Sequence, residues 1–352
     1  MSFKTTFSTN HKGSKNQNSK VDGRKGSLKM ADKLIVSVSP HVMTSYGTRK
    51  IMLNVLIALF PAVLASTYIF GLRALVIMLV SVASAVLFEH LWCVIMKTET
   101  TVTDLSASIT GLLLSMTLPV SVPLYMPVLG SFFAIIVAKC LFGGLGNNFI
   151  NPALAGRAFL LASYGVKMTT WTKPMSTAKI FGFGTEIDAL TTATPLGIFK
   201  ETGEVAHNYL SLFLGNVAGS IGEVSALALL IGFIYLLIRK IITPHAPLSF
   251  ILTVGILGFV FGRAGFFKGD FLFSILSGGV FLGGIFMLTD YTTSPTTRKG
   301  NIVAGILAGL ITVFIRLKGG LPEGVCYSIL LVNILAPQID KIFHPKKYGR
   351  VK

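Results

Sequence analysis

The chain has 352 residues, of which 52% are hydrophobic and only 13% are charged, whereas soluble domains average about 25% charged residues. This composition excludes an ordinary soluble domain and predicts a membrane protein with several spanning segments. Much of the net charge of +17 lies at the two ends, since residues 1–50 hold ten Lys or Arg against two Asp and residues 341–352 hold five against none. Basic ends beside apolar segments are typical of cytoplasmic termini and argue against nucleic-acid binding.

Residues 1–49 are polar and basic, without the apolar stretch of a cleavable signal peptide, so we expect none. The segment is predicted to be a largely disordered cytoplasmic arm. Residues 341–352 are predicted to be a second basic cytoplasmic tail. Both ends carry the charge that attracts anionic membrane lipid.

The apolar segments predict an all-α polytopic membrane protein with about ten transmembrane helices. Their ranges are 51–71, 74–96, 104–118, 123–142, 152–165, 222–238, 248–262, 271–288, 301–316 and 322–340. The third and fifth are among the shortest, and Gly or Pro borders both. Short or broken helices of this kind are typical of transporter folds.

A sequence echo indicates an internal repeat. Gly143-Gly144-Leu145 follows the fourth range, and Gly319-Gly320-Leu321 follows the ninth, half a chain length later. Because five spans per half is an odd number, the second half is expected to be inverted relative to the first. The sequence thus predicts a first membrane repeat at 50–165, a loop at 166–221 and a second membrane repeat at 222–340.

The distribution of Lys and Arg predicts the orientation. If the N-terminus is cytoplasmic, the basic residues around positions 97, 239 and 298 also lie inside, and the loop 166–221 lies outside. Asn208–Ser220 is interpreted as an interfacial or re-entrant helix. Were it to span the membrane, the second half would be reversed.

The loop contains Asp188-Ala189-Leu190-Thr191-Thr192-Ala193-Thr194-Pro195-Leu196, which resembles the acceptor motif for covalent flavinylation. The motif positions here are Asp188, Thr191, Ala193, the modified Thr194 and the apolar Leu196. The resemblance implies an FMN joined through its phosphate to the Thr194 hydroxyl. A simple Thr-rich turn is the alternative, because Thr and Asp bond readily to nearby backbone.

Two polar segments are candidates for a second flavin site or an ion path. In the first, Asn151 before a proline predicts a helix start whose free N–H groups suit a polar or anionic group, and Arg157 adds a charge. The second is hydroxyl-rich and contains Asp290 and Thr292. Capping and solvation are the alternative for the second segment.

Ionisable residues inside apolar ranges usually pair or line a pathway. Glu89 is predicted to pair with a neighbouring helix, and Lys139 to extend to the cytoplasmic surface. Cys93, Cys140 and Cys326 lack the paired spacing of a metal site, so we expect small buried hydrophobes and no metal centre.

The acceptor motif, the ten ranges, the half-chain echo and the segments 147–157 and 289–299, with Val36–His41 ahead of them, resemble the D subunit of the Rnf complex, the ion-translocating ferredoxin:NAD+ oxidoreductase. The resemblance covers residues 33–345. A sister family, the B subunit of the sodium-pumping NADH:quinone reductase, shares the fold and the flavin loop, so a quinone-linked role stays open.

The resemblance implies an electron-carrying subunit, not catalytic alone, in the bacterial cytoplasmic (inner) membrane. Electrons pass from ferredoxin to NAD+ while Na+ or H+ moves outward. The implied partners are the other Rnf subunits, A, B, C, E and G, of which the G member is nearest, and a flavin transferase during maturation. The implied cofactors are covalent FMN and a second, non-covalent flavin such as riboflavin. A passive channel or solute carrier on a similar inverted-repeat fold is the alternative.

Overall fold

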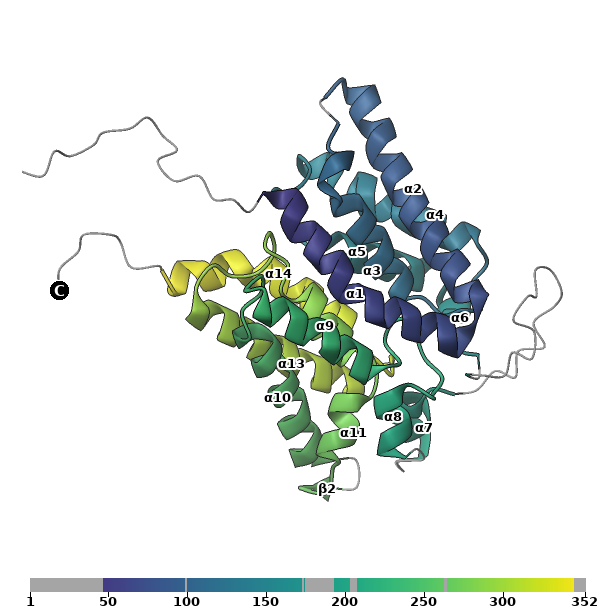
Figure 1. Cartoon of the computed structure of the whole chain (residues 1–352). Helices are drawn as coiled ribbons and strands as arrows, with labels where there is room; N and C mark the ends of the chain where they lie inside the picture. Colours follow the sequence, from purple (N-terminus) through teal and green to yellow (C-terminus); the bar gives the residue numbers. More distant parts are fainter. Residues whose placement is uncertain are drawn as a thin grey trace, which may run out of the picture. The chain divides into compact units, whose positions relative to one another are not determined.

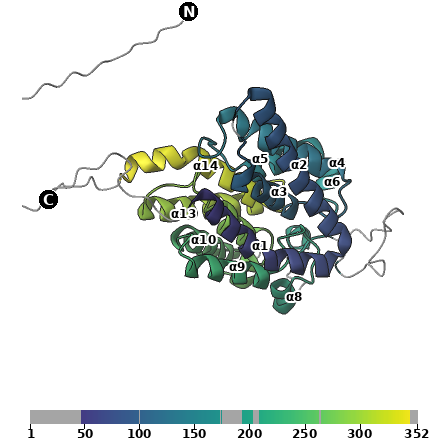
Figure 2. The same cartoon turned by 45° about the horizontal axis from the view of Figure 1, so that its top comes forward.

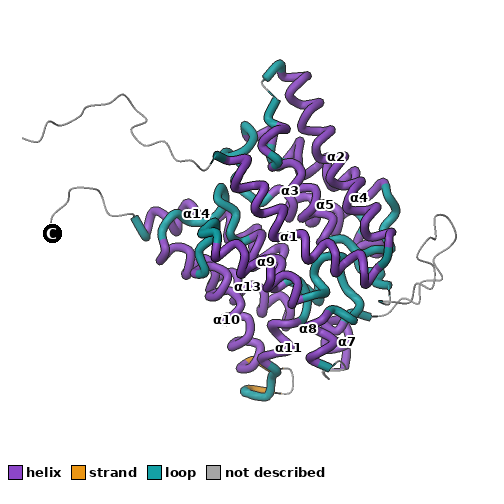
Figure 3. Tube along the Cα trace, viewed as in Figure 1, coloured by secondary structure: helices purple, strands orange, loops and turns teal. Residues whose placement is uncertain are grey.

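The computed structural model describes residues 47–98, 100–172, 174, 193–202, 208–262 and 265–344. Of the predicted N-terminal arm only residues 47–49 are described, and of the predicted C-terminal tail only residues 341–344, where α14 continues to Ile342. Within the described ranges the fold is mostly helical (Figure 3). Strands are limited there to β1 (Phe261–Gly262) and β2 (Gly265–Phe266), which pair antiparallel.

The helices before the central loop are α1 (Thr48–Phe70), α2 (Leu72–Met96), η1 (Val102–Asp104), α3 (Ser106–Met116), α4 (Tyr125–Phe132), the π-helical η2 (Phe133–Val137), η3 (Cys140–Phe142), α5 (Pro152–Ser163) and α6 (Gly165–Met168). The loop region contributes α7 (Pro195–Thr202) and α8 (Tyr209–Leu214). The later helices are α9 (Ala226–Ile238), α10 (His245–Val260), α11 (Phe271–Leu276), α12 (Val280–Leu282), the π-helical η4 (Gly283–Met287), α13 (Arg298–Lys318) and α14 (Val325–Ile342) (Figure 1).

The protein is a multi-pass membrane protein. Among the described residues, five segments are long and apolar enough to cross a membrane: α1, α2, Tyr125–Phe142, α13 and α14. The apolar helices α3, α9 and α10 are shorter. Each of the ten predicted ranges contains helix, while ten spans in two inverted repeats stay a prediction.

The long helices expose apolar side chains that a water-soluble helix would bury. Phe60, Leu64 and Tyr68 of α1 and Leu79 and Ile95 of α2 are all more than half exposed. A helix that is apolar on every face is stable only in a protein core or in lipid. These faces therefore contact lipid or neighbouring subunits.

The helices of the two halves pack in a similar order. In the first half α2 packs against α3 and α4, and in the second α10 packs against α11 and α13. α1 lies against α9, and α5 lies against α14 (Figures 1 and 2). Corresponding helices of the two halves therefore have corresponding packing partners, as the predicted repeat requires.

Two helices stop where a straight span would continue. α3 ends at Met116, and α11 ends before Ser277, with Gly278 in the left-handed region at φ 70°. A buried coil after α8 reaches the first of these breaks, and its Ile221 and Gly222 N–H groups donate to the carbonyls of Leu118 and Met116 at 2.9 and 2.7 Å. Asn208–Ser220 is thus a six-residue helix followed by coil, rather than one re-entrant helix.

We expect Gly232→Val to destabilise the contact between α1 and α9. A Cβ at Gly232 would lie 2.2 Å from the Ala58 carbonyl oxygen, and backbone cannot yield as a flexible side chain does. Overpacking of this kind costs about 1–3 kcal/mol. Thermal unfolding in detergent measures the loss. The control is Gly320→Val, where a Cβ meets no atom within 4 Å. Equal melting temperatures for the two variants would contradict the prediction.

Candidate functional site

Thr194 is the residue that caps the N-terminus of α7. Its Oγ1 accepts a hydrogen bond from the Gly197 N–H at 3.0 Å, and its carbonyl accepts from Ile198 at 2.9 Å. Pro195 occupies the first helical position, where its missing N–H costs nothing. The hydroxyl is partly exposed at the positive end of a helix, a favourable position for a phosphate.

The other positions of the acceptor motif divide between described and undescribed chain. Ala193 is exposed and Leu196 is buried, beside Thr194. Asp188 and Thr191 lie outside the described residues. The described half of the motif thus presents a small exposed residue before the hydroxyl and an apolar anchor after it.

A small open cavity adjoins Thr194 and is called here the Thr194 pocket. Its wall combines Trp171, the start of α7, the buried coil after α8, the break after α11 and the turn before α14. Ser220 lines it and is fully buried, and its Oγ has no hydrogen-bond partner among the described residues. An orphaned polar atom in the wall fits a pocket that receives a polar ligand.

A buried ion cluster reaches this pocket through its two glutamates. The Arg157 guanidinium of α5 donates from Nη1 to Glu223 Oε1 at 2.5 Å and from Nη2 to Glu323 Oε2 at 2.6 Å. The three side chains are 9%, 7% and 17% exposed. Glu323 Oε1 also accepts from the Gly279 N–H at 2.5 Å. Both glutamates line the pocket.

Arg316 completes the cluster from α13. Its guanidinium donates to the Ser274 and Ser277 carbonyls at 2.8 and 2.9 Å, which closes the backbone break after α11. A Cβ at Gly278 would lie 3.2 Å from both Arg316 and Glu323 and 2.8 Å from Leu196 Cδ1. Leu196 of the acceptor motif therefore packs directly beside the cluster.

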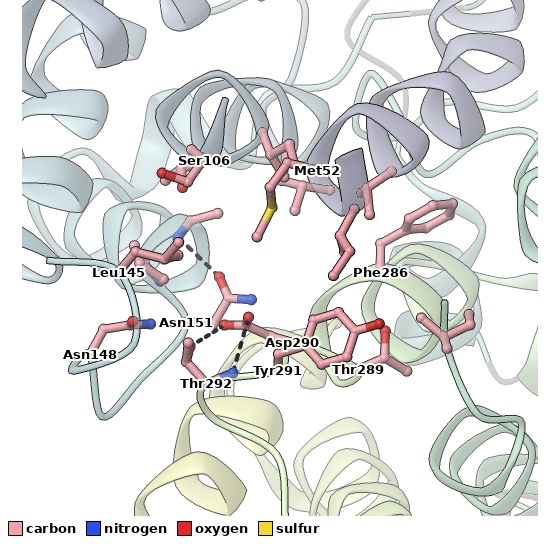
Figure 4. A pocket seen from close by; sticks show the side chains of 18 of the residues that line it. Met52, Ser106, Leu145, Asn148, Asn151, Phe286, Thr289, Asp290, Tyr291 and Thr292 are labelled. Carbon is pink, nitrogen blue, oxygen red and sulfur yellow. Dashed lines mark hydrogen bonds between the residues drawn. The ribbon is translucent and has the colours of Figure 1, made fainter. Parts of the chain in front are cut away.

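A second cavity, larger than the Thr194 pocket, is called here the Asn151 pocket. The predicted helix start at Asn151-Pro152 is confirmed, because Asn151 Oδ1 accepts from the N–H groups of Ala153 and Leu154 at 3.0 and 3.4 Å. Asn151 Nδ2 donates to the Met287 carbonyl at 3.2 Å, which ties α5 to the end of η4. Asp290 and Thr292 lie on the same wall (Figure 4).

Two polar groups in the Asn151 pocket are distinctive. Asn148 is buried, and its Oδ1 has no partner among the described residues. Asp290 Oδ2 accepts from the hydroxyls of Thr292 and Thr293 at 3.1 and 3.3 Å. Burial raises the pKa of the Asp290 carboxyl above its ordinary value, and these hydrogen bonds oppose the rise.

The structure therefore divides the residues that the sequence grouped as a second site. Asn151, Asp290 and Thr292 line one pocket, while Arg157 binds Glu223 and Glu323, which line the Thr194 pocket. Glu223, Glu323 and Arg316 were missed. Each glutamate stands directly before an apolar run, which is the one sequence signal that could have marked it.

Glu89 and Lys139 form a second buried ion pair. Lys139 Nζ lies 2.7 Å from Glu89 Oε1 and donates to Ser106 Oγ at 2.6 Å. The predicted pairing of Glu89 with a neighbouring helix is confirmed. The predicted extension of Lys139 to the surface is wrong, because the side chain is 3% exposed and finds its partner inside. Lys139 also lines the Asn151 pocket.

The cysteines are buried thiols. Cys93, Cys140 and Cys326 are free. Among the described residues no group of three His, Cys, Asp or Glu side chains could hold a metal ion.

Lys139→Met is expected to destabilise the protein by about 3–5 kcal/mol, because it leaves the buried Glu89 without a positive partner and with only the Thr101 hydroxyl as a donor. The double variant Lys139→Met with Glu89→Met should recover most of this loss, since an apolar pair needs no compensation. Thermal unfolding of the four proteins of the cycle gives the coupling energy. A Lys139→Met variant as stable as the wild type would show that the ion pair contributes nothing to the stability of the protein.

Residues 35–349 match the family model described as the NQR2, RnfD, RnfE family. The chain is 45% identical over 324 residues to the D subunit of the proton-translocating ferredoxin:NAD(+) oxidoreductase complex of Clostridium ljungdahlii, covering 89% of this chain and 96% of the relative. It is 47% identical over 323 residues to the Na(+)-translocating counterpart of Acetobacterium woodii, covering 91% and 96%. It is 37% identical over 349 residues to the D subunit of the ion-translocating oxidoreductase complex of Escherichia coli K12, covering 90% and 99%. The resemblance to the D subunit is thereby confirmed, and the chain belongs to the NQR2, RnfD, RnfE family.

Proposed function

We propose that the chain is the electron-carrying membrane subunit of a ferredoxin:NAD+ oxidoreductase complex that moves Na+ or H+ outward. The observation that carries the proposal is the family match over residues 35–349 together with Thr194 as the cap of α7. Relatives at 45% and 47% identity are named for H+ and Na+ respectively, so the degree of identity favours neither ion.

Thr194 is the proposed attachment point of FMN. The partly exposed hydroxyl suits attack by a transferase, and the N-terminus of α7 suits the resulting phosphodiester. The adjoining pocket offers an apolar wall with the orphaned Ser220 Oγ. A bound flavin supplies one- and two-electron transfer, which links one-electron clusters to a hydride acceptor.

Thr194→Val is expected to abolish covalent flavin, because the variant has no hydroxyl to esterify. Fluorescence of the denatured polypeptide in a gel under ultraviolet light measures it, in cells that express the transferase. The matched control is Thr202→Val, which makes the same change at an exposed position of the same helix and should leave the band bright. A dark wild-type band would instead favour the passive channel or solute carrier.

The Asn151 pocket is the proposed seat of a second, non-covalent flavin, with riboflavin as the expected species. Its wall supplies an unpartnered amide oxygen on Asn148, the capping amide of Asn151 and the Asp290 carboxyl. The Asn148 oxygen and the Asp290 carboxyl can accept from the ring N–H of an isoalloxazine, the second N–H of the Asn151 amide can donate to a ring carbonyl, and the surrounding lining is largely apolar.

Asn148→Leu is expected to lose the non-covalent flavin and to keep the covalent one, because it removes the orphaned acceptor. Chromatography of flavin released by denaturation measures the first, and gel fluorescence measures the second. The control is Asn147→Leu, an adjacent exposed amide outside the pocket lining. Retention of released flavin in Asn148→Leu would place that flavin elsewhere.

The proposed topology follows from charge and from the packing order. Both termini are proposed to be cytoplasmic and the flavin loop extracytoplasmic, with two inverted repeats of five helices. Two similar halves joined at broken helices form an element that can adopt two arrangements, which ion coupling requires. The proposed partners are the A, B, C, E and G members of the Rnf complex, with the flavin-bearing G member nearest Thr194.

A further inference from the structure

We propose that Glu223 takes up a proton when a group bound in the Thr194 pocket takes up an electron. The buried ion cluster of Arg157, Arg316, Glu223 and Glu323 then offsets the added negative charge. The inference rests on the proposed function, since it assumes a flavin on Thr194. It assigns to Glu223 a role beyond holding the fold together.

The cluster is close enough to the pocket to respond to charge there. Glu223 and Glu323 both line the cavity, and they are the only carboxyl groups among its described lining residues. Leu196, two residues after Thr194, also lies close to the cluster. A Cβ built at Gly278 would lie 2.8 Å from the Leu196 side chain and 3.2 Å from those of both Arg316 and Glu323. Because the cluster side chains are buried, charges near them interact far more strongly than in water.

The two carboxylates are held differently. Glu323 uses both oxygens, one on Arg157 Nη2 and one on the Gly279 N–H. Glu223 accepts through Oε1 alone from Arg157 Nη1, with the Ser220 hydroxyl beside its carboxyl group. A Cβ at Gly279 would lie 2.7 Å from Oε1 of both glutamates, so the carboxylates crowd the same point. Two like charges at such a site favour protonation of one, and Glu223 is the less firmly held.

The charge balance sets the direction of the response. The charged or titratable groups that face Glu223 are Arg157 of α5, Glu323 before α14, Arg316 of α13 and Cys326 of α14. With both glutamates ionised and the thiol neutral, two positive and two negative charges cancel. One electron from the ferredoxin-linked chain then adds one negative charge to the pocket. One proton from extracytoplasmic water forms an O–H bond on Glu223, and the total stays at zero. Reoxidation releases that proton.

The experiment uses the purified complex. Redox-induced infrared difference spectra should show a protonated-carboxyl band on reduction, and the reduction potential of the Thr194 flavin should fall as pH rises. The Thr194→Val complex supplies the baseline for the other flavins. In Glu223→Gln we expect loss of the band and a flatter pH dependence, although Gln keeps an acceptor for Arg157. A purely structural role would move neither signal.

The matched control is Glu201→Gln, the same change at an exposed carboxylate of α7, which should keep both signals because solvent screens it. A flavin-bearing Glu223→Gln complex with an unchanged band and pH dependence overturns the inference and leaves the proposed function standing. Loss of the signals in Glu323→Gln but not in Glu223→Gln overturns the assignment to Glu223. Absence of flavin from the wild-type polypeptide overturns the proposed function itself.

If Glu223→Gln fails to assemble, Glu223→Asp replaces it. The shorter carboxylate keeps a titratable group and shifts the infrared band. A band unchanged in position would show that the proton resides elsewhere, and would overturn the inference as well.

Discussion

Arg157 joins α5 to two segments that lie far away in the sequence, and the Thr194 pocket depends on that junction. Its two ion pairs hold the coil before α9 and the turn before α14 at the same point. Neither segment is a regular helix, so neither could hold its place by backbone hydrogen bonds alone. Removing the guanidinium would leave two buried carboxylates without a partner, the situation in which a buried pair is most costly to break.

Breaks in membrane helices are possible only where the freed backbone groups find partners, because lipid offers none. The end of α3 is satisfied by the coil that reaches it, through Ile221 and Gly222. The end of α11 is satisfied by Arg316. Arg316, which satisfies the end of α11, also lies beside Glu323, which lines the Thr194 pocket. The polar site and the irregular backbone therefore depend on each other.

The sequence was sufficient where the signal is local. Helix-length apolar runs placed helix in every predicted range, and Asn151-Pro152 placed the start of α5, because a cap and a first-position proline act within one turn. It was insufficient where partners come from far away. The sequence near Lys139 predicts a side chain at the surface, because its partner Glu89 lies 50 residues earlier, on α2. Arg157 lies in the same predicted segment as Asn151, but its partner Glu323 comes 166 residues later in the sequence and lines the other pocket.

The positions of the two ion clusters follow from the cost of burying charge. An apolar side chain of similar size usually stabilises a core as well as a buried pair does, so stability alone explains such pairs poorly. Here each cluster reaches the wall of a cavity, Lys139 at the Asn151 pocket and the two glutamates at the Thr194 pocket, and the linings share no residue. An ion cluster that is neutral in sum and can bind one proton is consistent with the role proposed for Glu223. For the Glu89–Lys139 pair the structure shows its place beside the Asn151 pocket.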